Sequence, residues 1–138
     1  MNKQGGFTYL AVLFAIALLG IGLVAASEVW VTTARRQRME QLEWVGQQYT
    51  QAIGSYYEAS PGRVKAFPKS LRDLIEDRRF PFTRRHLRFL FVNPFTGAAD
   101  WELLQAADGG IRGVRAPIGS WEGATPASRD FTYAPAAK

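Results

Sequence analysis

An uncharged run of 20 residues, from Phe7 to Ala26, is the strongest constraint on this chain of 138 residues. The first 27 residues carry one charged side chain, Lys3, whereas the other 111 carry 16 basic and 12 acidic ones. As a helix the run would be about 30 Å long, the thickness of a bilayer's hydrocarbon core. The sequence therefore predicts a membrane-spanning segment over 7–26 and one small soluble domain over 27–138. Because cysteine is absent, a disulfide framework is excluded.

Apolar residues continue at helical spacing beyond this run. They recur at intervals of 3, 3, 4, 4 and 3 residues, at Met39, Leu42, Val45, Tyr49, Ile53 and Tyr56. The first proline is Pro61. The pattern predicts one long helix from about Phe7 to Tyr57, apolar on all sides in its first half and amphipathic in its second.

A cleaved signal peptide is the first alternative for this segment. Val24-Ala25-Ala26 before Ser27 is a passable cleavage site of small residues. The apolar run, however, is longer than the usual apolar region of about 7 to 15 residues in a signal peptide. Since the helical pattern also continues past Ser27, an anchored helix is favoured.

The junction before the run is the most specific motif. A polar leader, MNKQGG, contains Lys3 and ends at Gly6, and Phe7 then opens the apolar helix. This junction resembles the type IV prepilin signal of pilins and of the pseudopilins of type II secretion systems. The resemblance implies that a prepilin peptidase cuts between Gly6 and Phe7 and methylates Phe7. The leader would be 1–6, and removing it from 138 residues would leave a mature chain of 132.

Two features of the segment depart from expectation. The fifth residue after the implied cut is usually glutamate in this family, where it pairs with a neighbouring subunit's N-terminal amine, but here it is Ala11. Small residues four apart would allow close approach of helices, and they occur as the pairs Ala11/Ala15 and Gly22/Ala26.

The second departure is the excess of arginines after the run, which would place the C-terminal side in the cytoplasm. The resemblance implies the opposite, with the domain in the periplasm, and the compound leader motif outweighs the charge bias.

The remaining residues predict short helices followed by a hairpin. Ser70 and Asp73 fit a capping box before a short helix over 71–78. Thr83 could cap a second short helix through Leu90, although 89–92 could equally be a strand. Asn93 to Gly97 reads as a turn, and Asp108-Gly109 between two apolar runs predicts a hairpin of 101–106 with 111–118. In the tail, Trp121, Phe131 and Tyr133 are expected to pin the chain.

This order of elements predicts the α+β class. We expect a pilin-like roll, in which a long N-terminal helix with a transmembrane first half packs on a small antiparallel sheet. Together with FPKSLRDL, NPFTGAADW and ADGGIRGV, it resembles the small pseudopilin-like proteins of type II secretion.

An arginine-rich stretch is the one charged cluster with a binding interpretation. Five arginines fall within eleven residues and are interleaved with Phe80, Phe82 and Phe89; they are Arg78, Arg79, Arg84, Arg85 and Arg88. Such a pattern suits an anionic partner, including single-stranded nucleic acid. We favour a solvated arginine surface whose phenylalanines point into the core.

The sequence offers no pattern of catalytic or metal-binding residues. His86 is the only histidine, and we expect it to be a surface or packing residue, because no nucleophile or metal site lies near it in sequence. The C-terminal acids Asp108, Glu122 and Asp130 are too far apart in sequence to predict the calcium site of the major pseudopilins. We therefore expect no catalysis, no metal and no cofactor.

The leading hypothesis is a structural pseudopilin-like subunit of a type II secretion or type IV pilus-like filament. The resemblance implies a single-pass location in the bacterial inner membrane. It also implies the partners, which are other pseudopilin subunits, the prepilin peptidase and an inner-membrane assembly platform. Two alternatives stay open: a DNA-binding minor pilin of an uptake machine, although nucleic acid is the less favoured partner, and a singly anchored exported domain without a filament role.

Overall fold

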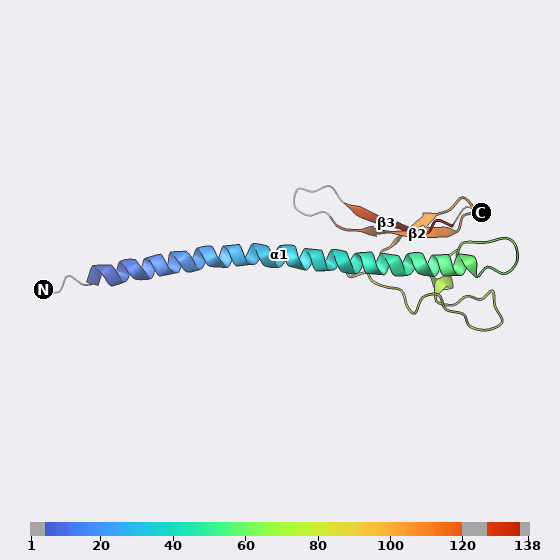
Figure 1. The fold of residues 1–138 in the computed structure, drawn as a ribbon, viewed down its shortest axis with the longest axis horizontal. Helices are drawn as coiled ribbons and strands as arrows, with labels where there is room; N and C mark the ends of the chain where they lie inside the picture. The colour runs from blue at the N-terminus through green and yellow to red at the C-terminus, as the bar shows by residue number, and fades with distance from the viewer. Residues whose placement is uncertain (1–4, 120–126, 136–138) are drawn as a thin grey trace. The chain divides into compact units, whose positions relative to one another are not determined.

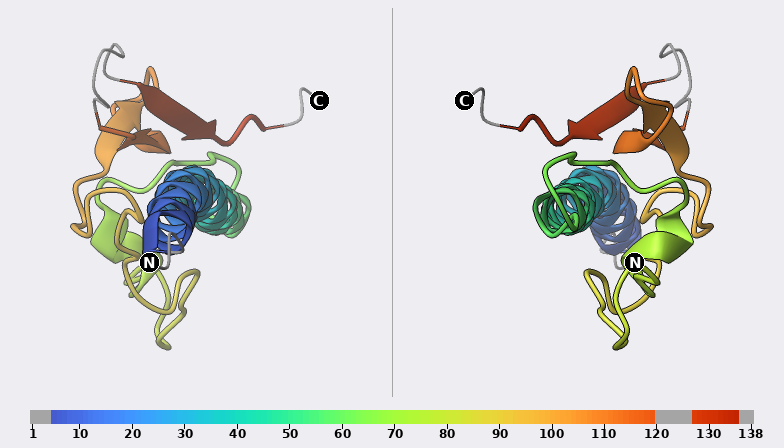
Figure 2. Two further views of the ribbon diagram at one scale, coloured as in Figure 1. Left: turned by 90° about the vertical axis from the view of Figure 1, so that its left-hand side faces the viewer. Right: turned by 90° about the vertical axis from the view of Figure 1, so that its right-hand side faces the viewer.

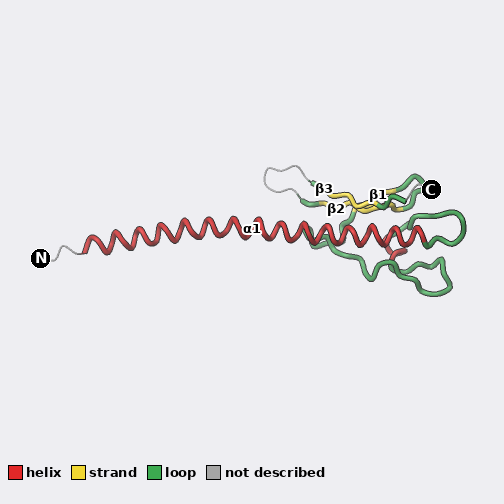
Figure 3. The backbone as a smooth tube through the Cα atoms, viewed as in Figure 1, coloured by secondary structure: helices red, strands yellow, loops and turns green. Residues whose placement is uncertain are grey.

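The computed structural model describes the backbone of residues 5–119 and 127–135, and the side chains of 8–20, 32–119 and 127–135. Its elements are helix α1 (Gly5–Glu58), the short 3-10 helix η1 (Leu71–Leu74) and strands β1 (Glu102–Gln105), β2 (Ile111–Pro117) and β3 (Ser128–Thr132) (Figures 1 and 3). The chain divides into two compact units, Met1–Gln37 and Arg38–Lys138, with the boundary inside α1.

Helix α1 confirms the helical pattern read from the sequence. It is 54 residues long, and its bounds lie within two residues of the predicted 7–57. The absence of proline before Pro61 lets the backbone hydrogen bonds continue without a break.

The predicted fold class was wrong in its membrane-spanning part. A bilayer span requires about 20 consecutive apolar residues, and the described part of the chain contains no helix long and apolar enough to cross a membrane. The expected transmembrane segment over 7–26 is therefore corrected to a helical segment within α1, and the pilin-like roll built on it is withdrawn. The elements that remain, α1 with a three-stranded antiparallel sheet, are compatible with the α+β class.

In the unit Arg38–Lys138, α1 buries one stripe of side chains. Five of the six residues predicted for this stripe are buried, namely Leu42, Val45, Tyr49, Ile53 and Tyr56, whereas Met39 is exposed. They form one core with η1, Trp101 and the inner residues of the sheet. Burial of each such side chain is worth about 1.5–3 kcal/mol, so this stripe holds the unit together.

The sheet is an antiparallel meander in the order β1-β2-β3. Strand β2 pairs with β1 and with β3, and a row of Leu103, Val114 and Phe131 crosses the three strands. Within this unit the strands lie on one side of α1, and the chain between η1 and β1 follows another side (Figure 2). The hairpin predicted at Asp108-Gly109 is confirmed, with Gly109 at φ 77° in the turn.

The segment between α1 and the sheet is less regular than predicted. The helix expected over 71–78 is the single 3-10 turn η1, capped by reciprocal bonds between Ser70 and Asp73. Neither the second helix expected over 83–90 nor the alternative strand over 89–92 forms; residues 75–101 contain only an isolated bridge between Asp77 and Arg84. Strand β3 was not predicted, although Phe131 and Tyr133 do pack on the core as expected; Trp121 lies outside the described residues.

Candidate functional site

The residues expected to be processed lie at the start of α1. Gly6 and Phe7 belong to the helix backbone, and the leader residues 1–4 and the side chain of Phe7 lie outside the described residues. Ala11 and Ala15 are exposed on α1. Gly22 and Ala26 also fall within α1, but their surroundings lie outside what is described.

The described side chains from Thr8 to Gly20 are all exposed. Eight are large and apolar and lie on every side of the helix: Tyr9, Leu10, Val12, Leu13, Phe14, Ile16, Leu18 and Leu19. A helix that is apolar all round is normally buried and not left in water. This segment is thus a candidate surface for helix packing.

The arginine-rich stretch does not form one uniform surface, because Arg79 turns inward. Its guanidinium donates from Nε to Asp77 Oδ1 over 2.8 Å and from Nη2 to Asp77 Oδ2 over 2.7 Å. It also donates to the Ser60 hydroxyl and to the Tyr56 carbonyl, both over 2.8 Å, and lies 3.5 Å from the centre of the Tyr56 ring. Arg79 is therefore an internal clamp that joins the 77–79 turn to the end of α1.

Asp77 is the buried counter-charge of this clamp. Its side chain is 0 % exposed, and the hydrogen bonds from Arg79 outweigh the burial and lower the pKa of the carboxyl from 3.8 to about 2. The same bonds raise the pKa of Arg79. The pair is charged at neutral pH, and its bidentate geometry is the strong form of such contacts.

His86 extends the clamp to a second residue of α1. Its side chain is 1 % exposed; Nε2 lies 3.2 Å from Asp77 Oδ2, and Nδ1 lies 2.8 Å from Ser55 Oγ. Burial lowers the pKa of His86, so the ring is neutral near pH 7. Because Asp77 is ionised, we assign the ring proton to Nε2, which leaves Nδ1 to accept from the Ser55 hydroxyl.

Serine, histidine and aspartate thus meet in a chain of hydrogen bonds that the sequence did not predict. The expectation that no nucleophile lies beside His86 was wrong, because Ser55 is 31 residues away in sequence but adjacent in space. Ser55 sits within α1, where backbone N–H groups bond to the preceding turn. An oxyanion hole of backbone donors therefore cannot form at Ser55. The geometry explains a structural cross-link between α1 and the 77–86 segment.

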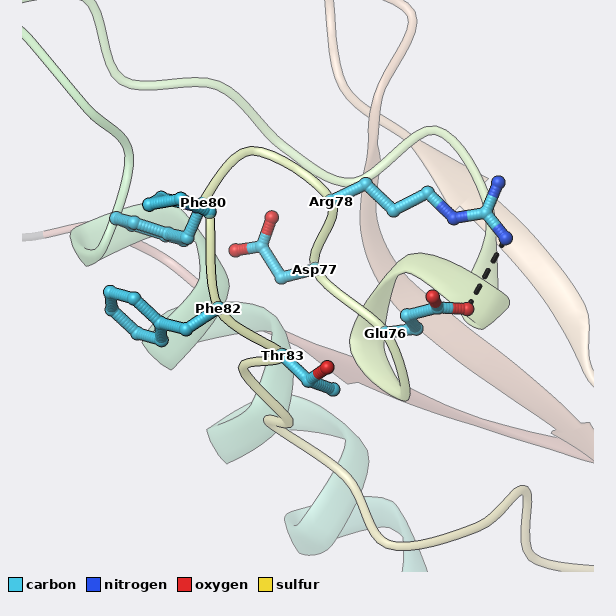
Figure 4. Close-up of a pocket in the computed structure, with 7 residues that line it drawn as sticks. Glu76, Asp77, Arg78, Phe80, Phe82 and Thr83 are labelled. Atoms are coloured by element: carbon cyan, nitrogen blue, oxygen red, sulfur yellow. Dashed lines mark hydrogen bonds and ion pairs between the residues drawn. The ribbon is translucent and has the colours of Figure 1, made fainter.

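Residues 78–83 form a loop whose two sides differ, as Figure 4 shows. Phe80 and Phe82 lie with ring centres 5.6 Å apart and nearly parallel, whereas Arg78 points away and pairs with Glu76 over 3.2 Å. A shallow pocket of about 180 Å³ lies among these residues. Phe82 is 61 % exposed and Phe89 is 56 % exposed, so the expectation that the phenylalanines of this stretch point into the core was wrong for these two residues.

The remaining candidates from the sequence are the C-terminal acidic residues, which were not expected to form a calcium site. Within the described ranges, no group of three histidine, aspartate or glutamate side chains is placed to hold a metal ion. Asp130 pairs with Arg115 over 2.6 Å, and Asp108 accepts from the Gly110 N–H over 3.0 Å; Glu122 lies outside the described residues.

A scan against protein-family models and searches of curated proteins and of solved structures found no match to this chain. The family resemblance therefore rests on the sequence motifs.

Proposed function

We propose that this chain is a structural, pseudopilin-like subunit of a type II secretion or related filament, without catalytic activity of its own. One observation carries the proposal. Directly behind a prepilin-like junction, α1 exposes apolar side chains on all sides over its described N-terminal part, residues 8–20.

Helix packing between subunits is the natural way to cover such a segment. Exposed apolar surface costs about 25 cal/mol of free energy per Å² in water, so burial of residues 8–20 against a neighbouring helix would lower the free energy of the subunit. Ala11 and Ala15 put small residues one turn apart, which lets a neighbouring helix come close. Because Ala11 cannot supply a carboxylate to a neighbour's amine, packing rather than an ion pair would hold these helices.

We also propose that the protein acts at the periplasmic face of the bacterial inner membrane. Prepilin peptidase, an assembly platform and other pseudopilin subunits are the proposed partners. These proposals rest on the leader motif, and a membrane-spanning helix is no part of them.

The decisive experiment is mass spectrometry of the protein expressed in cells with an active prepilin peptidase. We expect a chain that has lost six residues and begins with methylated Phe7. A Gly6→Val variant in the same cells is the matched control and should keep the leader. A wild-type N-terminus at Met1 or at Ser27 would rule out the proposal.

Assembly is tested separately by cysteine cross-linking, since the chain has no cysteine of its own. A single cysteine at Leu13 should form cross-linked species in cells, and Ala15→Phe should reduce them by blocking close approach. Cross-linking unaffected by Ala15→Phe would contradict packing through this face.

A further inference from the structure

A groove between α1 and the segment 86–91 lies beside the clamp, with which it shares His86, and outside the proposed packing surface over residues 8–20. It lies within the unit Arg38–Lys138 and has a volume of about 480 Å³. Its walls are Trp44 and Gln48 from α1, and His86, Arg88, Phe89 and Phe91 from the segment opposite. We call it the aromatic groove.

The aromatic groove is preformed, because both ends of the 86–91 segment are fixed. At one end His86 is held by Asp77 and Ser55. At the other end Phe91 is held through its backbone: Tyr49 Oη accepts from the Phe91 N–H over 3.0 Å, and the Trp101 indole donates to the Phe91 carbonyl over 2.8 Å. A partner therefore meets a wall that is already ordered, which lowers the entropic cost of binding.

The two rings at the mouth of the aromatic groove remain open to solvent. Trp44 is 52 % and Phe89 is 56 % exposed. Each packs against Phe91, with ring centres 5.4 Å and 4.6 Å from it. Tryptophan and arginine are the residue types that most often dominate binding energy at interfaces.

The charge of the segment that forms one wall of the aromatic groove has one sign. Residues 78–92 contain five arginines and no acidic residue. Arg79 pairs with Asp77, and Arg78 pairs with Glu76. Arg85 and Arg88, by contrast, are exposed and have no acidic partner among the described residues. A ligand with carboxylates beside an apolar anchor complements this surface.

The ring geometry favours an inserted side chain over stacked bases. Trp44 meets Phe91 edge-on at 85°, and Phe89 is tilted from Phe91 by 53°. Sequence-tolerant binding of single strands uses open aromatic faces on which successive bases stack. The rings here instead enclose a concave volume.

We propose that the aromatic groove binds an acidic segment of a partner protein. The segment inserts one aromatic or leucine-sized side chain between Trp44 and Phe89 and places its carboxylates at Arg85 and Arg88. This inference goes beyond the proposed filament role and does not depend on it, because no residue of α1 before Arg38 takes part.

The test is fluorescence anisotropy with the full-length protein and labelled synthetic peptides. The main probe is Gly-Glu-Asp-Phe-Glu-Asp-Gly; the same peptide with serine for phenylalanine tests the anchor, and lysine for every acid tests the charge. We expect the main probe to bind at least about ten-fold more tightly than either, and to weaken as salt rises. Oligothymidylate is the nucleic-acid probe.

The variants separate the aromatic groove from the general basic charge of the chain. Trp44→Ala, Phe89→Ser and Arg88→Glu should each weaken the main probe about ten-fold or more. Arg63→Glu, an exposed change of the same charge outside the groove, should change binding less than about two-fold. Two aromatic variants are used so that one misfolded protein, detected by tryptophan fluorescence, does not decide the result.

Four outcomes overturn the proposal. The main probe fails to bind at about 1 mM; the serine peptide binds equally well; Arg63→Glu weakens binding as much as Arg88→Glu; or oligothymidylate binds more tightly and depends on Trp44. The last result would identify the surface as a nucleic-acid site.

Discussion

Helix α1 contains two regions that share one backbone and differ in what covers them. From Thr8 to Gly20 every described side chain is exposed, including eight large apolar ones. From Leu42 to Tyr56 the apolar side chains form one stripe, and a sheet and a loop segment bury it. The comparison teaches that helix formation and core formation are separate here: the second region is packed within the chain, whereas the described side chains of the first are not covered by it.

The largest expected effect comes from breaking the clamp that holds the second region to its covering segment. Asp77→Ala leaves Arg79 and His86 without their shared carboxylate, so the free energy of unfolding should fall by about 3–5 kcal/mol. Chemical denaturation of the full-length protein, followed by tryptophan fluorescence, measures this loss.

Asp130→Ala is the matched control for that change, because it removes an exposed carboxylate from Arg115. It should cost far less. Equal losses in the two variants would mean that burial does not set the strength of the clamp.

The same substitution in the two regions of α1 should give different results. At Gly46 a methyl group would overlap the ring of Phe131, whereas at Gly20 it would meet nothing within 4 Å among the described atoms beyond the neighbouring helix backbone. Gly46→Ala should therefore destabilise the protein by about 1–3 kcal/mol. Gly20→Ala should be neutral or slightly favourable, because alanine is the better helix former.

Thermal unfolding of these two variants, measured side by side, checks the comparison directly. A loss of stability at Gly20 as large as the loss at Gly46 would show that the first region is packed within the monomer.

The clamp should also make stability depend on pH in two windows. The folded pKa of His86 lies below 6.5, so the unfolded chain takes up the proton first, and stability falls as pH drops below 6.5. The folded pKa of Asp77 is about 2 against an ordinary 3.8, so its contribution is complete above 3.8 and is lost as pH falls towards 2.

Denaturation curves at several pH values test these windows. His86→Gln should remove the loss just below pH 6.5 and keep the one at lower pH. A wild-type curve that stays flat from pH 7 to 5 would contradict the buried, neutral state assigned to His86.

The smallest effect is expected in the first region. Leu13→Ser removes an exposed apolar side chain, so the free energy of unfolding of the unit Arg38–Lys138 should change by less than about 0.5 kcal/mol. The cross-linking yield in cells, measured for this variant through a single cysteine at the exposed Ile16, should fall nonetheless, since the lost surface is the proposed packing surface. A stability loss above about 2 kcal/mol would place Leu13 in a core of the free subunit.

Local patterns explain which parts of the fold were predictable. The spacing of Leu42, Val45 and Tyr49 repeats with the period of a helix, and Asp108-Gly109 between apolar runs is a short-range hairpin signal. Residues 83–90 have no such period, and His86 is fixed by Ser55 and Tyr56 of α1 instead of by neighbours in sequence. Strand β3 has one buried residue, Phe131, which is too little alternation to identify a strand.

The candidate sites divide in the same way. The junction at Gly6 and Phe7 and the arginine-rich stretch are visible in sequence, because each is contiguous. Nothing in the local pattern distinguishes Arg79 from Arg78, yet Arg79 forms the clamp and Arg78 is exposed. Trp44 was not singled out, although its position beside the buried stripe was a signal that it borders the core.

The sequence by itself determined the long helix, its change from all-round apolar to amphipathic, and the hairpin, because each of these features depends on residues that are only a few positions apart. Only the tertiary structure decided that Ser55, Asp77, Arg79 and His86 form one hydrogen-bonded cluster, and that Trp44 and Phe89 stay open at the mouth of a groove. The physical reason is that burial and pairing are set by segments some 20 to 45 residues apart in sequence, as with Arg79 and Tyr56 or Tyr49 and Phe91. Such contacts leave no period in the chain from which to read them.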